Sequence, residues 1–219
     1  METEADTLFV NNIALDNEQA FNIAHDALIE KQCEHFIAYA NWEMYPYKPK
    51  VSFKVAHNGQ YILIRFYITE KYIRASKCET NADVYKDSCL EFFISFNGND
   101  YYNIEINCIG VVHMAYGSRI SERQLINKDI IGKITVHSTL GKMPFETKTG
   151  YFSWSMTVFI PVDCFVYSKV KLGRMSEAMG NFYKCGDELP EKHYLSWNPV
   201  KTPKPNFHKK EFFGKIIFN

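Results

Sequence analysis

The sequence has no excess of charge of either sign, because its 25 basic and 25 acidic side chains cancel over 219 residues. A nucleic-acid-binding protein needs a basic face that displaces counterions from phosphates, and a zero net charge gives no indication of one. The same balance argues against docking on an anionic membrane surface. We therefore expect the protein to bind neither nucleic acid nor a membrane.

Long apolar runs are also missing. No stretch approaches the roughly 18 residues that a membrane-spanning helix requires. The segment 1–6 is acidic and has neither the basic nor the apolar region of a signal peptide. As written, the chain is therefore expected in the cytoplasm, or in a secreted or periplasmic form if a leader has been removed.

Metal-binding and redox motifs are lacking too. The six cysteines form no CxxC pair and the seven histidines form no HxxxH or HExxH pattern, so we expect reduced thiols and no zinc site. No DxDxDG-like spacing marks a calcium loop. These patterns predict no cofactor and assign no metal. The cysteines are Cys33, Cys78, Cys89, Cys108, Cys164 and Cys185.

The sequence is instead rich in aromatic residues and in alternating patterns. Aromatics make up 16% of the chain, with 17 Phe and 14 Tyr. Segments 61–69, 89–96 and 101–108 alternate in a way that is typical of half-buried strands. Asn97–Asp100, between the last two, predicts a hairpin turn. Further strands are expected at 51–56, 111–116, 132–138, 151–160 and 211–218.

Many short strands without βαβ alternation indicate an all-β fold. We expect an antiparallel β-sandwich of the jelly-roll or immunoglobulin-like kind. No repeat, low-complexity tract or linker divides the sequence, so residues 1–219 are expected to form one domain. Short helices are predicted from Asp16 to Leu28, with Asp16 as the N-cap, and around Glu122 to Asn127.

The predicted hairpin places its even-numbered apolar residues on one face. Cross-strand partners share a face, so even-numbered residues must pair with even-numbered ones. The opposite face then carries carboxylates and carboxamides side by side, which is uncommon on a plain solvent face. This is the most informative surface of the sequence. Its residues are Glu91, Phe93, Asn103, Glu105 and Asn107.

The three tryptophans have different expected roles. Trp154 alternates in phase with apolar residues and is expected in the core, and Trp42 is expected to close one end of the sandwich. Trp197 begins a loop that prolines interrupt, where it either plugs the sandwich edge or offers a flat ring to a ligand. Phe207, in the same loop, is a comparable candidate ring. His208 beside it either fixes the loop or hydrogen-bonds a ligand.

Flat rings beside a polar sheet face are the parts that sugar recognition needs. Pyranose C–H faces stack on aromatic rings, carboxylates accept hydrogen bonds from hydroxyls, and Asn and Arg donate them. The polar face and the aromatics of adjoining loops supply these parts, which makes a mono- or oligosaccharide a candidate ligand.

Three segments carry the resemblance of this chain to a known family. They are Val84-Tyr-Lys-Asp-Ser-Cys-Leu-Glu-Phe-Phe-Ile-Ser-Phe, Tyr102-Asn-Ile-Glu-Ile-Asn-Cys-Ile-Gly110 and the ending Phe207-His-x-x-x-Phe-Phe-Gly214. In this order they resemble family 9 carbohydrate-binding modules and related DOMON-like sandwiches. The similarity covers most of the chain from about Val51 onward. It implies a non-catalytic β-sandwich that holds sugar between two aromatic rings and serves the degradation of polysaccharides such as cellulose or xylan.

Matched position by position, the resemblance places the first ring on Tyr85 and the second on Phe207, with Trp197 as an alternative. Better-known modules have Trp at these positions, so a smaller platform is expected. Glu91 matches the hydroxyl-binding carboxylate, and Arg119 is the candidate for the binding arginine. The predicted ligand-binding residues are Tyr85, Glu91, Asn107, Arg119, Trp197 and Phe207.

Structural interpretations stand beside these roles. Asp87 and Ser88 can cap a turn before the strand. Glu91 can form an ion pair with Arg65 or Arg119. The resemblance also implies a calcium ion, for which the available oxygen donors are Asp87, Asp100 and Asp129.

Two other functions stay open, and a third is disfavoured. A glycoside hydrolase would use Glu91 and Glu105, because cross-strand carboxyls reach the separation of about 5 Å found in retaining enzymes. A protein-interaction or regulatory sandwich would bind no sugar. Haem binding would need His113 and Met114, which point to opposite faces of one strand and cannot ligate one iron together. If the chain is a binding module, a separately encoded glycoside hydrolase is an expected partner.

Overall fold

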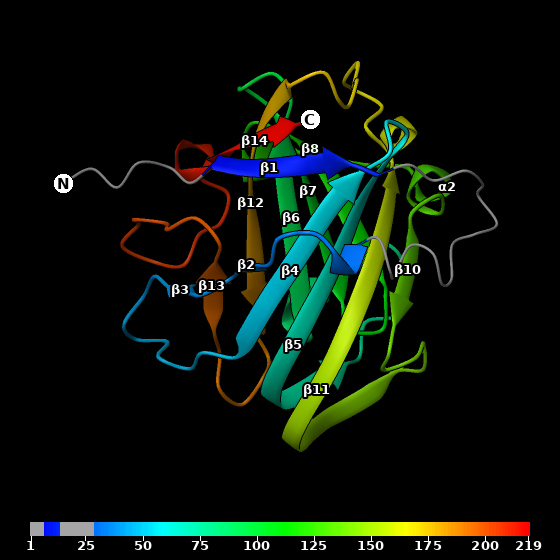
Figure 1. Ribbon diagram of the computed structural model, residues 1–219. Helices are drawn as coiled ribbons and strands as arrows, with labels where there is room; N and C mark the ends of the chain where they lie inside the picture. Colours follow the sequence, from blue (N-terminus) through cyan, green and yellow to red (C-terminus); the bar gives the residue numbers. More distant parts are fainter. Residues whose placement is uncertain (1–6, 14–28) are drawn as a thin grey trace.

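The protein is a β-sandwich of two layers, seen in a computed structural model that describes residues 7–13 and 29–219 (Figure 1). In spatial order, the first layer contains β10 (Thr135–Ser138), β11 (Phe145–Pro161), β5 (Tyr61–Ala75) and β4 (Lys50–His57). The second contains β14 (Gly214–Phe218), β12 (Ser176–Cys185), β6 (Cys89–Ser95), β7 (Tyr101–Asn107), β8 (Val112–Gly117) and β9 (Gln124–Leu125). At the edges, β2 (His35–Phe36) pairs with β4, and β13 (Tyr194–Ser196) pairs with β12 and β3 (Tyr39–Ala40).

Strand β1 (Thr7–Asn12) joins the two layers. Its first part pairs in parallel with β14, and Asn11 and Asn12 pair in parallel with β4. The other pairings between described strands are antiparallel. The predicted all-β sandwich is therefore confirmed, with β1 as the exception to antiparallel pairing.

The strands expected from alternation are present, but the helix expected around Glu122 to Asn127 is wrong. Gln124 and Leu125 are extended and pair with β8, so this segment adds an edge strand instead. The helix begins later, at α2 (Lys128–Ile131), where the Asn127 side chain accepts a hydrogen bond from the Asp129 backbone N–H. The expected helix at 16–28 lies outside the described residues. No helix in the described part is long and apolar enough to span a membrane.

The main core fills the space between the layers. Phe53 of β4 stacks on Phe182 of β12 at 3.9 Å between ring centroids, and Phe182 stacks on Phe92 of β6 at 4.6 Å. Trp154 is buried in this core, as predicted. Its indole N–H donates to the Glu70 carboxylate at 3.0 Å.

A buried ion pair crosses this core. The Lys184 ammonium on β12 lies 2.9 Å from the Glu70 carboxylate on β5, and both side chains are fully buried. Lys184 Nζ also lies 2.9 Å from His193 Nε2. Because burial and the Lys184 charge disfavour protonation, the pKa of His193 falls well below its usual value, which leaves the ring neutral and able to accept from the ammonium.

A second apolar cluster lies on the opposite face of β6, β7 and β12. Phe93, Tyr101 and Tyr183 point from these strands into it, and the C-terminal segment supplies Phe207 and Phe213. The Asn181 amide anchors this segment by donating to the backbone carbonyls of Asn198 and Phe212. The polar sheet face is therefore covered by the segment 197–213.

Candidate functional site

A cavity of about 520 Å³ lies between the covered sheet face and the loops beside it. Its size falls within the roughly 300–1,000 Å³ typical of small-molecule sites. Strands β6 and β7 form one wall, the turn η2 (Val84–Lys86) and the end of β12 form another, and the C-terminal segment closes it. Its acidic residues are Asp83, Glu91, Glu105 and Asp187, and its aromatic rings include Tyr85, Tyr194 and Phe207.

Two carboxyls stand at the sheet wall of this cavity. Glu91 and Glu105 share one face of the sheet, as the parity of the hairpin predicted, and they are direct cross-strand partners, only 4% and 5% exposed. The Cys185 thiol donates to Glu91 Oε1 at 3.0 Å, and the Asn103 amide donates to Glu105 Oε1 at 2.9 Å. Neither carboxyl takes part in the ion pairs expected for Glu91.

Burial dominates the electrostatics of the carboxyl pair. It raises the pKa of Glu91 well above its usual range, and the neighbouring Glu105 charge raises that pKa further. Burial also raises the pKa of Glu105, while the charges of His113 and Arg123 oppose the shift. The pair therefore tends to retain a proton, and a protonated carboxyl can donate to a ligand oxygen as well as accept.

Arg123 is the cation that sequence reasoning missed. Its side chain lines the cavity, and its Nε and Nη1 atoms are buried without a hydrogen-bond partner among the described residues. Leaving a buried donor unsatisfied costs about 1–3 kcal/mol, and more for a charged group. The guanidinium is thus placed to donate to an oxygen of a bound ligand.

The expected arginine, Arg119, lies outside the cavity. Its side chain is 77% exposed, and its Nη1 lies 3.8 Å from the Glu122 carboxylate. Both arginines flank the turn η3 (Ile120–Glu122), and only the second points inward. Arg65, the other partner considered for Glu91, lies 3.6 Å from Glu30 instead.

The two predicted rings do meet at this cavity. Tyr85, from η2, is half-buried, whereas Phe207 is only 8% exposed. Phe207 stacks on Tyr183 at 4.1 Å with an interplanar angle of 13°. The Trp42 ring centroid lies 5.9 Å from that of Phe207, within the second apolar cluster. Tyr85 is consequently the freer ring of the two.

Two other predicted residues are occupied elsewhere. Trp197 is buried in the main core, edge-on to Phe182 and Phe53, because the chain enters the sandwich just after β13. The Asn107 amide is fully buried, donates to the Lys77 carbonyl and Asp87, and accepts from the Val111 N–H. Both side chains support the fold and do not line the cavity.

The Asp87 side chain forms hydrogen bonds with the segment at Ser76 and Lys77 and does not cap its own turn. Its buried carboxylate accepts from the Ser76 N–H and hydroxyl and from the Lys77 N–H, at 2.9–3.0 Å. Since its oxygens face N–H and O–H donors, they do not fit a calcium ion, which needs oxygen ligands. Asp100 and Asp129 lie near different turns and form no shared cluster with it in the part that the structure describes. These aspartates therefore do not form the calcium site that the resemblance implied.

Two histidines, His113 and His208, lie at this cavity. His113 lines the cavity while Met114 is buried in the main core, so the two lie on opposite faces, as predicted. His208 Nδ1 lies 2.9 Å from the Tyr101 hydroxyl. Burial, reinforced by Arg123 and His113, lowers the pKa of His208 to about 3, so its ring is neutral.

A larger cavity of about 730 Å³ lies on the first layer, beside Phe36, Lys50 and Tyr67. No carboxylate, arginine or histidine lines it. Its polar groups are lysines and hydroxyls, whereas the smaller cavity combines carboxyls with a guanidinium, which form charge-assisted hydrogen bonds. The smaller cavity is therefore the candidate site.

A two-layer sandwich with a cavity lined by rings, carboxyls and a guanidinium has the parts that a carbohydrate-binding module uses. The chain belongs to carbohydrate-binding family 9, whose sequence profile matches residues 22–218. A search of curated proteins finds no match.

Solved structures agree with this assignment. A candidate carbohydrate-binding protein from Bacteroides uniformis is 34% identical over 99% of this chain and 100% of its own, with a TM-score of 0.94. Two structures of a family 9 module from Caldicellulosiruptor kristjanssonii share the fold. The complex with glucose has 9% identity, a TM-score of 0.63, and coverage of 98% and 96% of the two chains. The complex with cellotriose has 10% identity, a TM-score of 0.55, and coverage of 97% and 93%.

Proposed function

We propose that the cavity beside β6 and β7 binds a mono- or oligosaccharide without transforming it. Tyr85 would stack on a sugar face, with Phe207 forming the opposite wall. Glu91 and Glu105 would exchange hydrogen bonds with hydroxyls, and Arg123 would donate to a hydroxyl or ring oxygen. The observation that carries the proposal is the Arg123 guanidinium beside two carboxyls in a cavity lined by rings, with two buried nitrogens that have no hydrogen-bond partner among the described residues.

Glucose and cellotriose are the first ligands to test, because family 9 structures similar in fold bind them. Isothermal titration of the full chain with these sugars and with xylo- and manno-oligosaccharides would measure affinity. Arg123→Ala should weaken binding by tenfold or more, since a charged hydrogen bond contributes about 1.5–3 kcal/mol. Arg119→Ala is the matched control, because the exposed Arg119 lies outside the cavity.

Equal affinity in wild type and Arg123→Ala, or an equal loss in Arg119→Ala, would refute the site. A folded protein that binds none of these sugars would instead favour a protein-interaction role. We expect the sugar to be recovered unchanged, because the proposed role is passive. Chromatography of the titrated oligosaccharide would reveal hydrolysis by Glu91 and Glu105 if it occurred.

As a binding module, the chain would serve polysaccharide degradation together with a separately encoded glycoside hydrolase. Retention of the protein on insoluble cellulose or xylan, lost in Arg123→Ala, would support this role. Elution by free sugar would connect retention to the same cavity.

A further inference from the structure

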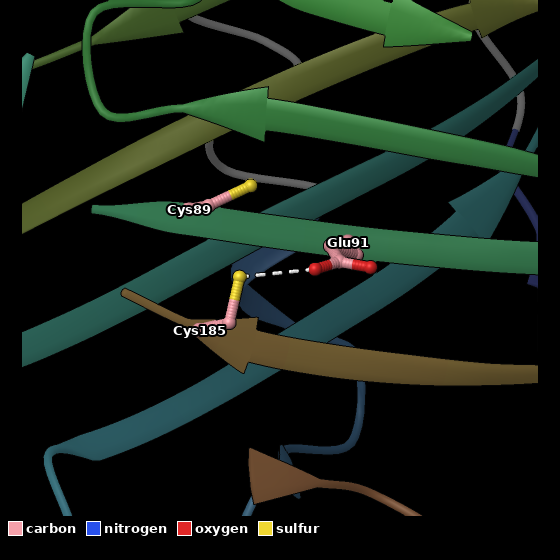
Figure 2. A group of neighbouring side chains, drawn as sticks. All are labelled: Cys89, Glu91 and Cys185. Atoms are coloured by element: carbon pink, nitrogen blue, oxygen red, sulfur yellow. Dashed lines mark hydrogen bonds between the residues drawn. The ribbon is translucent and has the colours of Figure 1, made fainter. Parts of the chain in front are cut away.

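Two cysteines that are far apart in sequence meet at the back of the cavity. Cys89 and Cys185 are direct cross-strand partners on β6 and β12. Glu91 lies two residues after Cys89, so both side chains project from the same face of β6. Figure 2 shows the three side chains together, with the Cys185 sulfur directed at the Glu91 carboxylate.

The three ligand atoms are close enough to share one ion. The two sulfurs and a carboxylate oxygen all lie within 4.8 Å of one another. Around a tetrahedral zinc ion, with Zn–S near 2.3 Å and Zn–O near 2.1 Å, neighbouring ligand atoms lie roughly 3.5–4 Å apart. Small side-chain adjustments would therefore bring Cys89, Cys185 and Glu91 to one metal.

The two thiols and one carboxylate indicate which kind of ion would bind. Thiolate ligands favour zinc and other thiophilic ions and disfavour calcium and magnesium, which prefer oxygen. Two sulfurs and one carboxylate leave a fourth tetrahedral position, as in zinc sites that bind water or a ligand. We propose that Cys89, Cys185 and Glu91 bind Zn²⁺ or a similar thiophilic divalent cation.

The cavity gives this ion a path and an open position. Glu91 and Cys185 line the cavity, whereas Cys89 lies behind them. Glu105 and Asp187 add nearby carboxylates, so a cation entering from the cavity meets acidic groups. The fourth position would face the cavity, where water or a ligand oxygen can occupy it.

Binding requires both thiols to lose their protons to solvent, with no change of oxidation state. Burial raises the pKa of the Cys89 thiol to about 11, and it also raises the pKa of Cys185. Both sulfurs are therefore protonated without metal, and uptake of the ion should release protons. This site was invisible in the sequence, because the two cysteines lie on separate strands and show no ligand spacing.

Cobalt titration of the reduced, chelator-treated full chain tests the proposal without any sugar. We expect one Co²⁺ per chain, a thiolate-to-cobalt charge-transfer band, and its loss when Zn²⁺ displaces cobalt. Cys89→Ser and Cys185→Ser should abolish the band. Glu91→Gln should weaken Co²⁺ binding by at least about tenfold. Cys164→Ser is the matched control, because Cys164 is also a buried free thiol but lies outside the cluster.

A reduced, folded protein that gives no band, or a band that survives both serine variants, would overturn the proposal. X-ray absorption at the zinc edge of the wild-type complex needs no variant and provides a second test. Two sulfur ligands in the first coordination sphere are expected, and a sphere without sulfur would exclude this site. Because neither measurement involves sugar, failure here leaves the proposed sugar binding untouched.

Discussion

Glu91 on β6 and Glu105 on β7 face each other directly across the ladder, and both are buried at the wall of one cavity. Two like charges this close repel strongly when water is excluded. The charges of Arg123 and His113 partly compensate, without forming an ion pair with either carboxyl. Burying the two carboxyls side by side therefore lowers the stability of the folded protein when both are ionised.

Glu91→Gln should make the stability of the metal-free protein less dependent on pH. Burial and Glu105 raise the folded pKa of Glu91 above its usual 4.5, so the folded state keeps a proton that the unfolded state releases. The resulting stability is present below pH 4.5 and is lost as the pH rises through the folded pKa. Gln does not titrate, so the stability of the variant relative to wild type should increase as the pH rises.

Melting temperatures of both proteins in chelator, from about pH 4.5 to 8, would measure this difference. Each 1 kcal/mol corresponds to about 2–4 °C in a protein of this size. Acid destabilisation through His193 and His208, whose pKa values are lowered, is common to both proteins and cancels in the comparison. Parallel melting curves would contradict the buried carboxyl pair.

Tyr85→Ala and Phe207→Ala should separate binding from stability. Tyr85 is half-buried at the cavity wall, so its removal should weaken sugar binding about tenfold and lower the melting temperature little. Phe207 packs between Tyr183 and Trp42, so its truncation should weaken sugar binding and also lower the free energy of unfolding by about 3–5 kcal/mol. Chemical denaturation together with sugar titration would measure both effects. A Tyr85 variant that unfolds while keeping its affinity would show that the ring is structural.

Trp197→Phe should lower stability and leave sugar affinity unchanged. The indole packs edge-on to Phe182 in the main core, and the smaller ring would leave a void there. We expect a loss of about 1–3 kcal/mol in the free energy of unfolding. Reduced sugar affinity in a variant of normal stability would show that Trp197 belongs to the binding site.

Asp87→Ala should be strongly destabilising. It leaves the Ser76 and Lys77 N–H groups without their acceptor and removes one of the two acceptors of the Asn107 amide, at a cost of about 3–5 kcal/mol in the free energy of unfolding. Asp83→Ala is the control, because its side chain is 54% exposed and its pair with Lys86 is worth at most about 1 kcal/mol. Similar urea midpoints for the two variants would be inconsistent with this account.

The sequence predicted the hairpin and its register because these depend on neighbouring residues. Even–even pairing followed from alternation alone, and it correctly placed Glu91 and Glu105 on the same face of the sheet. The meeting of Cys89 with Cys185 depends on long-range strand order, which local patterns do not encode. Arg119 and Arg123 stand four residues apart around one turn, and only the path of that turn decides which faces inward.

The coverage of the polar face also depended on long-range packing. Prolines correctly predicted a loop near residue 200, but not that Asn181 would hold it over β6 and β7. The sequence offered Trp197 as a candidate binding ring, but its position just after β13 directs its side chain into the core.

A crystal structure of the protein with cellotriose tests the central claim most directly. The account predicts a sugar ring against Tyr85, with hydroxyls or the ring oxygen bonded to Glu91, Glu105 and Arg123. A sugar bound instead beside Phe36 and Tyr67 on the first layer, with this cavity empty, would contradict it.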